Sequence, residues 1–162
     1  TRRSSDLFME DNFEAVSLVE NGDVVVADGA TVEEIFSSVC DKAELPSGLD
    51  SSVLVPELLD REKVLSTAVG NGIAIPHPRR PLFSDENASR VIVAYLKTPI
   101  DMQAPDFRKV NVMFILLSAS SQFHIKALSS LAKLFKNEEF KKGLQLKPGK
   151  AQLAELIKKC SK

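Results

Sequence analysis

Two long apolar runs dominate the hydrophobic pattern of this chain, at residues 90–97 and 110–117. Near-continuous apolar character of this kind is typical of strands that are buried on both faces of a sheet. Shorter β-branched runs at 24–26 and 73–75 favour two further strands, and Asp28-Gly29 after the first of them indicates a turn. The pattern therefore predicts a central sheet.

Apolar residues at helical spacing predict the elements around that sheet. Thr31 and Glu34 have the spacing of a capping box and precede an apolar series with helical period. Pro56 lies too deep in its helix for a first-turn position, so we expect a kink or a late start there. Helices are predicted over residues 13–19 (ended by Asn21-Gly22), 32–44, 51–62, 123–135, 138–146 and 150–159.

Strands in the middle of the chain with helices around them indicate an α/β fold. We predict a three-layer sandwich in which a central mixed β-sheet is flanked by helices on both faces. A chain of 162 residues fits a single domain, spanning 1–162 with its core at about 13–160. The chain begins at Thr1 and not at methionine, so we expect residues 1–12 to be a linker or tail from a longer protein.

Composition excludes several classes of function. With 21 Lys and Arg against 22 Asp and Glu, the net charge is −1, which argues against a surface devoted to nucleic acid or anionic lipid. No apolar run approaches the length of a membrane span, so no direct membrane insertion is expected. Cys40 and Cys160 lie far apart, without the spacing of a zinc site or a disulfide framework. We therefore expect a cytoplasmic protein without a bound metal.

His77 is the most informative candidate for chemistry. It follows the predicted strand 73–75 and lies between Pro76 and Pro78, which stop the strand and stiffen the backbone around the ring. Arg79 and Arg80 come next and create a positive field suited to an anion such as a phosphoryl group. An imidazole is largely neutral and nucleophilic near neutral pH. The alternative is a strand-end histidine in a proline-rich turn.

Two further side chains lie where they could reach the same site. His124 is at the start of the helix after the buried strand 110–117, a position where ligand sites gather in open α/β folds. It shares a helical face with Leu128 and Leu131, so it could instead cap the core. Arg61 lies at the end of the predicted helix 51–62. Its guanidinium could bind phosphate oxygens at the site, or it could be an ordinary cation that the helix dipole favours at a C-terminus.

Other catalytic patterns are missing from the sequence. Gly70-x-Gly72 lacks the third glycine of a dinucleotide fingerprint and the Gly-Lys-Ser/Thr of a P-loop. There is no G-x-S-x-G elbow and no H-E-x-x-H motif. We therefore expect no nucleotide or other cofactor.

The motifs as a whole resemble the enzyme IIA domains of the mannitol/fructose class (EIIA type 2) of the bacterial phosphoenolpyruvate-dependent phosphotransferase system, and most of all the nitrogen-regulatory IIA proteins. The resemblance extends from about Val24 to the C-terminus. It rests on the segments Leu58-Leu59-Asp60-Arg61-Glu62, Ser66-Thr67-Ala68-Val69-Gly70-Asn71-Gly72-Ile73-Ala74-Ile75-Pro76-His77, and His124-Ile125 followed by Leu128, Leu131 and Ala132.

The resemblance implies a phosphohistidine carrier. His77 would accept a phosphoryl group from HPr or its nitrogen-branch counterpart, Arg61 would neutralise the phosphoryl oxygens, and His124 would hydrogen-bond or orient the group. Thr67 and Arg79 are secondary candidates for support of the phosphoryl site. A downstream IIB domain or a regulatory target would be the next partner. Many sugar-type members have Gly after the active histidine where this chain has Pro78, which removes a backbone N–H from the site.

We therefore expect a regulatory phosphocarrier that passes the group on or signals by its phosphorylation state. One alternative is the sugar-specific IIA component of a fructose/mannitol-type transporter. A second is a binding module of a larger regulator, such as the effector-sensing domain of a transcription regulator, which partners control without phosphorylation.

Overall fold

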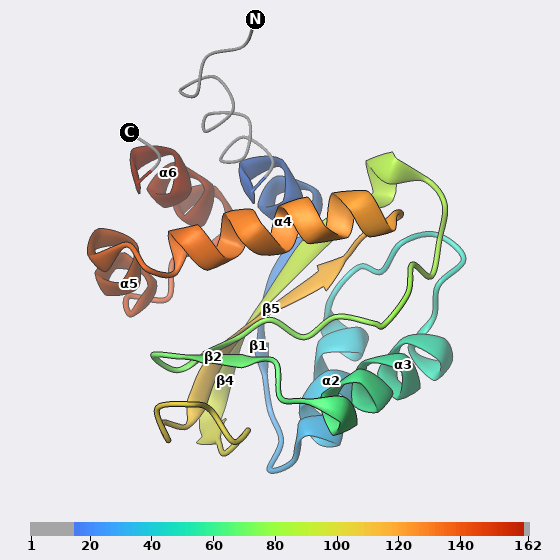
Figure 1. Cartoon of the computed structure of the whole chain (residues 1–162), viewed down its shortest axis with the longest axis horizontal. Coiled ribbons are helices and arrows are strands. Elements are labelled where there is room, and N and C mark those ends of the chain that lie inside the picture. Colours follow the sequence, from blue (N-terminus) through green and yellow to red (C-terminus); the bar gives the residue numbers. More distant parts are fainter. Residues whose placement is uncertain (1–14, 161–162) are drawn as a thin grey trace, which may run out of the picture.

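The structure is a computed structural model and describes residues 15–160. Its elements follow the alternation that the hydrophobic pattern predicts (Figure 1). The strands are β1 (Asp23–Ala27), β2 (Ala68–Gly70), β3 (Ile73–Ala74), β4 (Arg90–Ile100) and β5 (Val110–Leu117). The helices are α2 (Val32–Lys42), α3 (Ser51–Val64), α4 (Ser121–Leu134), α5 (Glu138–Leu144) and α6 (Lys150–Cys160), with a helical segment at 15–21 and a 3-10 turn at Glu86–Ala88. The start of the predicted helix 13–19 and the predicted tail 1–12 lie outside the described residues.

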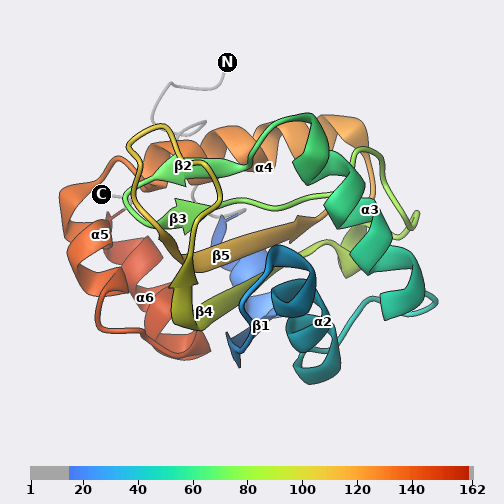
Figure 2. The same ribbon diagram turned by 90° about the horizontal axis from the view of Figure 1, so that it is seen from below.

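The five strands form one mixed sheet in the order β1-β4-β5-β3-β2. Figure 2 shows this order with β1 and β2 at the two edges. Strand β1 runs parallel to β4, and β3 runs parallel to β5, whereas the pairs β4–β5 and β2–β3 are antiparallel. Because β3 and β5 are parallel neighbours, the segments that follow their carboxyl ends meet at the same edge of the sheet.

Side chains alternate between the two faces of the sheet and so build two cores. On β4, Val91, Val93 and Tyr95 belong to one core, and Ile92, Ala94 and Leu96 belong to the other. The first core is completed by the segment 15–21 with α4, α5 and α6, and the second by α2 and α3. The period of two along a strand thus produces the predicted three layers, with helices on both faces (Figure 1).

Helix boundaries follow from local capping. The Thr31 hydroxyl accepts a hydrogen bond from Glu34 N, and the Glu34 carboxylate accepts one from Ala30 N, so the predicted capping box marks the start of α2. The Ser120 hydroxyl caps α4 by accepting from Phe123 N, and the Asn137 side chain caps α5. These caps satisfy backbone donors that have no partner within their helices.

Of the kink or late start expected at Pro56, the structure excludes the late start. Helix α3 begins at Ser51, with Asp50 as its N-cap, so there is no late start. Pro56 removes the N–H that would have bonded Ser52 O, and both residues are exposed. Water can therefore satisfy the carbonyl that proline leaves unpaired.

The sheet also differs from the prediction near the first histidine. Strand β3 ends at Ala74, and β2 pairs with it through a hairpin that the analysis of apolar runs missed. The turn residues are Asn71 and Gly72, with φ of 57° and 80°. An Asn-Gly dipeptide is the strongest short-range signal of a hairpin in a sequence. Three residues of β2 carried too little apolar pattern to show a strand, but the turn dipeptide could have revealed it.

Strand β4 is longer than the predicted 90–97 and reaches Ile100. The register shifts between Tyr95 and Ile100, and this irregularity accommodates Pro99 within the strand. Among residues 15–160, no helix has both the length and the apolar character that a membrane span requires.

Candidate functional site

The end of β3 positions His77. Beyond Ala74 the chain continues beside β5, because Ile75 N donates to Thr67 O and Leu116 N donates to Pro76 O at 2.9 Å. Pro76 and Pro78 are buried, and His77 between them is only half-buried. The two prolines therefore anchor the backbone and leave the ring at the surface, as the sequence indicated.

The end of β5 brings the second histidine to the same place. His124 lies in the first turns of α4, and the centres of the His77 and His124 rings are 4.7 Å apart with an interplanar angle of 58°. Ser118, the residue after β5, is buried, and its hydroxyl lies 3.0 Å from His124 Nδ1. His124 thus faces the first histidine and does not cap the core.

A hydrogen bond fixes the tautomer of His77. Nδ1 lies 2.7 Å from the carbonyl oxygen of Ile75, and a carbonyl can only accept, so Nδ1 must carry the proton. In the neutral ring, Nε2 then holds a free lone pair. The nucleophilic atom of His77 is therefore Nε2.

Burial and charge keep both rings neutral. Burial lowers the pKa of His77, the positive charge of Arg61 lowers it further, and the bond to Ile75 O opposes these effects. The pKa of His124 falls to about 4, mainly through burial and then through repulsion from His77 and Arg61. Both imidazoles are thus uncharged at neutral pH.

Arg61 projects from the last turn of α3 into the same site. Its Nη1 donates to Leu65 O at 2.6 Å, which anchors the guanidinium at the helix end. Arg61 forms no ion pair within residues 15–160, although it is close enough to lower the pKa of both histidines. Most of its N–H donors are therefore available to an anion.

A chain of hydrogen bonds connects the helix that carries Arg61 with the strand end that carries His77. The Glu62 carboxylate accepts from Thr67 N at 3.1 Å and from the Thr67 hydroxyl. Thr67 O accepts from Ile75 N, and Ile75 O accepts from the His77 ring. Thr67 is buried, so this pair of contacts is protected from water. The Glu62–Thr67 pair thus fixes Arg61 and His77 relative to one another.

Of the two remaining sequence candidates, Arg79 lies at the rim of the site and Thr67 lies in its buried interior. Arg79 lines a cavity of about 180 Å³ together with His124, Ser118 and Pro78. Arg80, on the same cavity, pairs with Glu57 at 3.1 Å and is 69% exposed. Arg79 is thus near the second histidine, while Thr67 is hydrogen-bonded to Glu62 at the end of α3.

Two residues of the site escaped the sequence analysis. Ser118 is the only residue whose side chain is bonded to His124 within the described part of the chain, and a serine just after a buried strand was the available signal. Glu62 sits beside Arg61, but its partner Thr67 follows the helix end, so no helical spacing indicates the contact. Within residues 15–160, no three His, Cys, Asp or Glu side chains group in a way that could hold a metal ion.

Comparison with known protein families supplies independent information. Residues 18–160 match the model of a family described as phosphoenolpyruvate-dependent sugar phosphotransferase system, EIIA 2. A nitrogen regulatory protein from Klebsiella oxytoca is 35% identical over 126 residues, which cover 76% of this chain and 75% of that protein.

Solved structures agree on the fold. The nitrogen regulatory protein IIA-Ntr from Neisseria meningitidis superimposes with a TM-score of 0.66 at 23% identity, covering 88% of this chain and 94% of that one. The mannitol enzyme IIA of Escherichia coli, solved in complex with phosphorylated enzyme IIB, gives a TM-score of 0.61 at 18% identity and covers 85% and 94% of the two chains. The α/β architecture predicted from the sequence is thereby confirmed.

Proposed function

Since the chain belongs to the phosphotransferase system EIIA 2 family, we propose that it carries a phosphoryl group on His77 and regulates other proteins through its phosphorylation state. Membership makes it a phosphotransferase component that works with phosphocarrier proteins and IIB domains. We propose three things beyond family membership: the residue that accepts the phosphoryl group, the side chains that support it, and the protein that donates it.

The geometry of His77 supports its role as acceptor. Its Nε2 has a free lone pair, because Nδ1 donates to Ile75 O. In the transfer, Nε2 attacks the phosphorus of a donor phosphohistidine in line. The new N–P bond forms as the donor's N–P bond breaks, and the bonding electrons return to the donor's imidazole. No proton has to leave His77 before the attack, since the ring is already neutral at Nε2.

Two neighbours can stabilise the charge of the transferred group. The guanidinium of Arg61, held at Leu65 O and without a carboxylate partner in the described chain, can bind two phosphoryl oxygens. If the Ser118 hydroxyl donates to His124 Nδ1, His124 Nε2–H is left to donate to a third oxygen. These groups are in position before the donor arrives, so little reorganisation is needed during transfer.

One observation carries the proposal. Two neutral imidazoles lie with ring centres 4.7 Å apart beside an arginine that has no acidic partner within residues 15–160. A structural role for this group is hard to justify, since a half-buried cation without a counter-ion is a cost to folding. An incoming dianionic phosphoryl group would remove that cost.

The surface around the site suits a protein donor. Exposed apolar side chains flank both Arg61 and His124: Val64 is 63% exposed, Leu65 is 69% exposed and Ile125 is 68% exposed. An apolar rim around a polar centre is typical of protein interfaces. We assign this surface to docking of HPr or an HPr-like carrier, and then of the next acceptor.

The regulatory role is favoured by the relatives. The Klebsiella relative is named a nitrogen regulatory protein and covers three quarters of this chain. A sugar-specific role is the second candidate, because the mannitol enzyme IIA shares the fold and binds a phosphorylated IIB domain. The regulatory role accords better with the sequence relatives.

Intact mass spectrometry at neutral or alkaline pH tests the proposal. The protein is incubated with phosphoenolpyruvate-charged HPr and, separately, with its nitrogen-branch counterpart. We expect a single acid-labile phosphoryl addition to the unaltered chain and none to the His77→Ala variant. The carrier that reacts faster identifies the branch.

A control variant tests whether a change of surface charge far from the site affects the transfer. Lys158→Gln removes an exposed cation on α6, and it should accept the phosphoryl group at the unaltered rate. If neither carrier phosphorylates the folded chain, the proposal fails and a binding module that works without phosphorylation becomes the better account. Phosphorylation of folded His77→Ala would assign the acceptor to another residue.

A further inference from the structure

A second polar cavity lies at the other end of the strands that lead to the histidines. It encloses about 620 Å³ and includes Ile73 and Val112, which pair at the start of β3 and β5. His77 and Ser118 follow the opposite ends of these strands. From Val112 to Ser118 the strand geometry gives a separation of about 20 Å. The cavity is therefore not part of the phosphoryl site.

The charge of this cavity is strongly positive. Five cationic side chains line it, against the single carboxylate of Glu138: Arg108, Lys109, Lys141, Lys142 and Lys147. Lys141 Nζ is 2.7 Å from that carboxylate and Arg108 Nε is 4.0 Å from Asp106 Oδ2, whereas Lys109, Lys142 and Lys147 have no ion-pair partner within residues 15–160. Because the whole chain has a net charge of −1, this is a local concentration of charge that would attract an anion.

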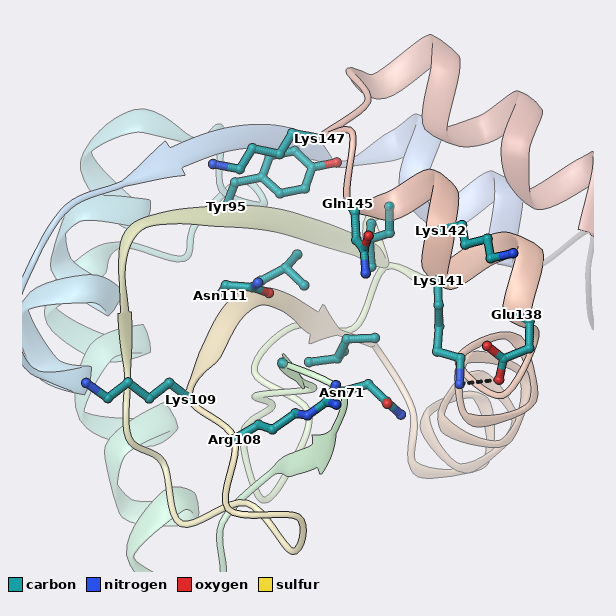
Figure 3. A pocket seen from close by; sticks show the side chains of 14 residues that line it. Asn71, Tyr95, Arg108, Lys109, Asn111, Glu138, Lys141, Lys142, Gln145 and Lys147 are labelled. Atoms are coloured by element: carbon teal, nitrogen blue, oxygen red, sulfur yellow. Dashed lines mark ion pairs between the residues drawn. The ribbon is translucent and has the colours of Figure 1, made fainter.

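The inner wall offers hydrogen bonds as well as charge. Figure 3 shows Arg108 and Asn71 on one side, Gln145 and Lys141 on the other, and Asn111 between them. Lys109 and Lys142 point away from this space. The side chains of Asn111 and Gln145 have no hydrogen-bond partner in the described chain. Carboxamides both donate and accept, which matches the chemistry of hydroxyl groups.

The wall is held in place by contacts among its segments. The Asp106 carboxylate accepts from Asn71 N at 2.8 Å and from Arg108 N at 3.2 Å, so it joins the hairpin turn to the loop that carries Arg108. The Tyr95 hydroxyl donates to Pro148 O at 2.6 Å and fixes the segment after α5. A preformed wall reduces the entropy that ligand binding must overcome.

Gly72 allows the Asn111 side chain to lie close to the hairpin turn in this wall. A Cβ at this position would lie 2.9 Å from Asn111 Oδ1, and its φ of +80° favours glycine. Asn111 N and Val112 N both donate to Gly72 O. The glycine therefore lets the Asn111 amide lie directly against the turn.

We infer that this cavity binds a small phosphate ester with a hydroxyl-rich body. Arg108 and Lys141 would hold the phosphate, while the carboxamides of Asn71, Asn111 and Gln145 would bond the hydroxyls. The volume lies within the range of small-molecule sites. Free phosphate would use the cations alone, whereas an ester would also use the carboxamides, so the ester is the better fit. The inference goes beyond the proposed function and does not depend on His77.

A sugar phosphate and a nucleotide share this chemistry, and Phe107 distinguishes them. Phe107 is 96% exposed and directly precedes Arg108 in the sequence, outside the lining of the cavity. An exposed aromatic residue next in sequence to a phosphate-binding arginine could stack on a base, whereas a sugar phosphate has no base to offer. A nucleotide should therefore lose affinity in Phe107→Ala, and a sugar phosphate should not.

NMR titration of backbone amides tests the inference on the full chain. Inorganic phosphate, glucose 6-phosphate and AMP are added in turn, and glucose serves as the uncharged control. We expect saturable shifts at Asn71, Arg108, Asn111 and Gln145, with at least one ester binding tenfold or more tightly than inorganic phosphate. Glucose should cause no saturable change.

Variants show whether the side chains act as proposed. Arg108→Gln should weaken binding of the ester at least tenfold, and Gln145→Ala should weaken it severalfold. Lys158→Gln, which removes an exposed cation outside the cavity, should change it less than twofold. All three positions are exposed, so the amide spectra should show an unaltered fold.

Three results would overturn the inference. The first is the absence of saturable shifts at the cavity with any of the probes. The second is equal affinity for inorganic phosphate and both esters, since the carboxamides would then contribute nothing. The third is a set of shifts confined to the surroundings of His77 and His124. None of these results bears on phosphorylation of His77, which the mass measurement tests separately.

Discussion

The two ends of the β3–β5 strand pair, to which we assign two anion sites, arrange their polar and cationic groups in different ways. At the carboxyl ends, two half-buried neutral histidines and Arg61 form a small, fixed group. At the amino ends, a wide cavity is surrounded by five cations that are mostly exposed. Electrostatic interactions are strong between a few partly buried groups, whereas each interaction of an exposed charge is weakened by water.

The difference teaches how one sheet can separate chemistry from recognition. Covalent transfer needs a neutral nucleophile held within a narrow range of positions, and burial lowers the pKa of His77 in the direction that the proposed role requires. Reversible capture of a ligand needs a long-range field and adaptable hydrogen bonds instead. If this comparison holds, changes at one end should leave the other end unaffected.

Among variants that keep His77, the largest effect should come from Arg61→Lys. Lysine keeps the charge but loses the planar pair of donors, so we expect phosphorylation to slow about 100-fold, or about 2.7 kcal/mol in activation free energy. Rapid-quench kinetics with charged carrier would measure this, while glucose 6-phosphate binding stays constant. An unchanged rate would remove Arg61 from the site, and Lys158→Gln is the control for general loss of surface charge.

A smaller effect is expected from Glu62→Gln, which disturbs the contact between α3 and Thr67. The amide has one acceptor oxygen in place of two, so one of the two bonds to Thr67 is lost. We expect transfer to slow about tenfold, or about 1.4 kcal/mol, because Arg61 and His77 are held less firmly. Asp60→Asn, an exposed acid on the same helix, is the matched control.

A double-mutant cycle separates positioning from a direct role of Glu62. If Glu62 acts through Thr67, Glu62→Gln combined with Thr67→Val should be no slower than the worse single variant. Fully additive losses would show that the two residues act independently of one another.

Gly72→Ala should affect the opposite end of the sheet. The residue has positive φ, and a Cβ would displace the Asn111 amide, so we expect a loss of about 1 to 2 kcal/mol in unfolding free energy. Gly48→Ala has nearly the same φ with no atom within 4 Å of its Cβ, so it measures backbone strain alone. Urea unfolding gives both values. Equal losses would show that Asn111 does not resist the added carbon.

Acidification should give the smallest effect. The folded pKa of His124 is about 4, so between pH 7 and pH 6 only the unfolded chain takes up its proton. Stability should therefore fall as pH falls, by about 0.5 kcal/mol for this half-buried ring. Urea unfolding at the two pH values measures the loss, and His124→Gln should reduce it. An identical slope in that variant would contradict the shift.

Local sequence patterns predicted most of the elements and the surface position of one candidate residue, His77. The apolar runs gave β4 and β5, and the capping box gave α2, because these signals depend on neighbouring residues alone. The two prolines around His77 indicated, for the same reason, a ring at the surface, and the structure shows it half-buried there. The hairpin at Asn71-Gly72 was also available in the sequence, and it was missed because the search followed apolar runs.

Tertiary structure decided which of these segments meet. The 4.7 Å approach of His77 to His124 depends on β3 and β5 being parallel neighbours, which no local pattern specifies. The bond from Glu62 to Thr67 depends on how the chain turns after α3. The basic cavity likewise gathers α5 and two loops that lie far apart in the sequence. The pairing of distant segments is set by burial of the whole sheet. Local sequence therefore identified the candidate chemical groups, and the tertiary fold determined which of them lie close together.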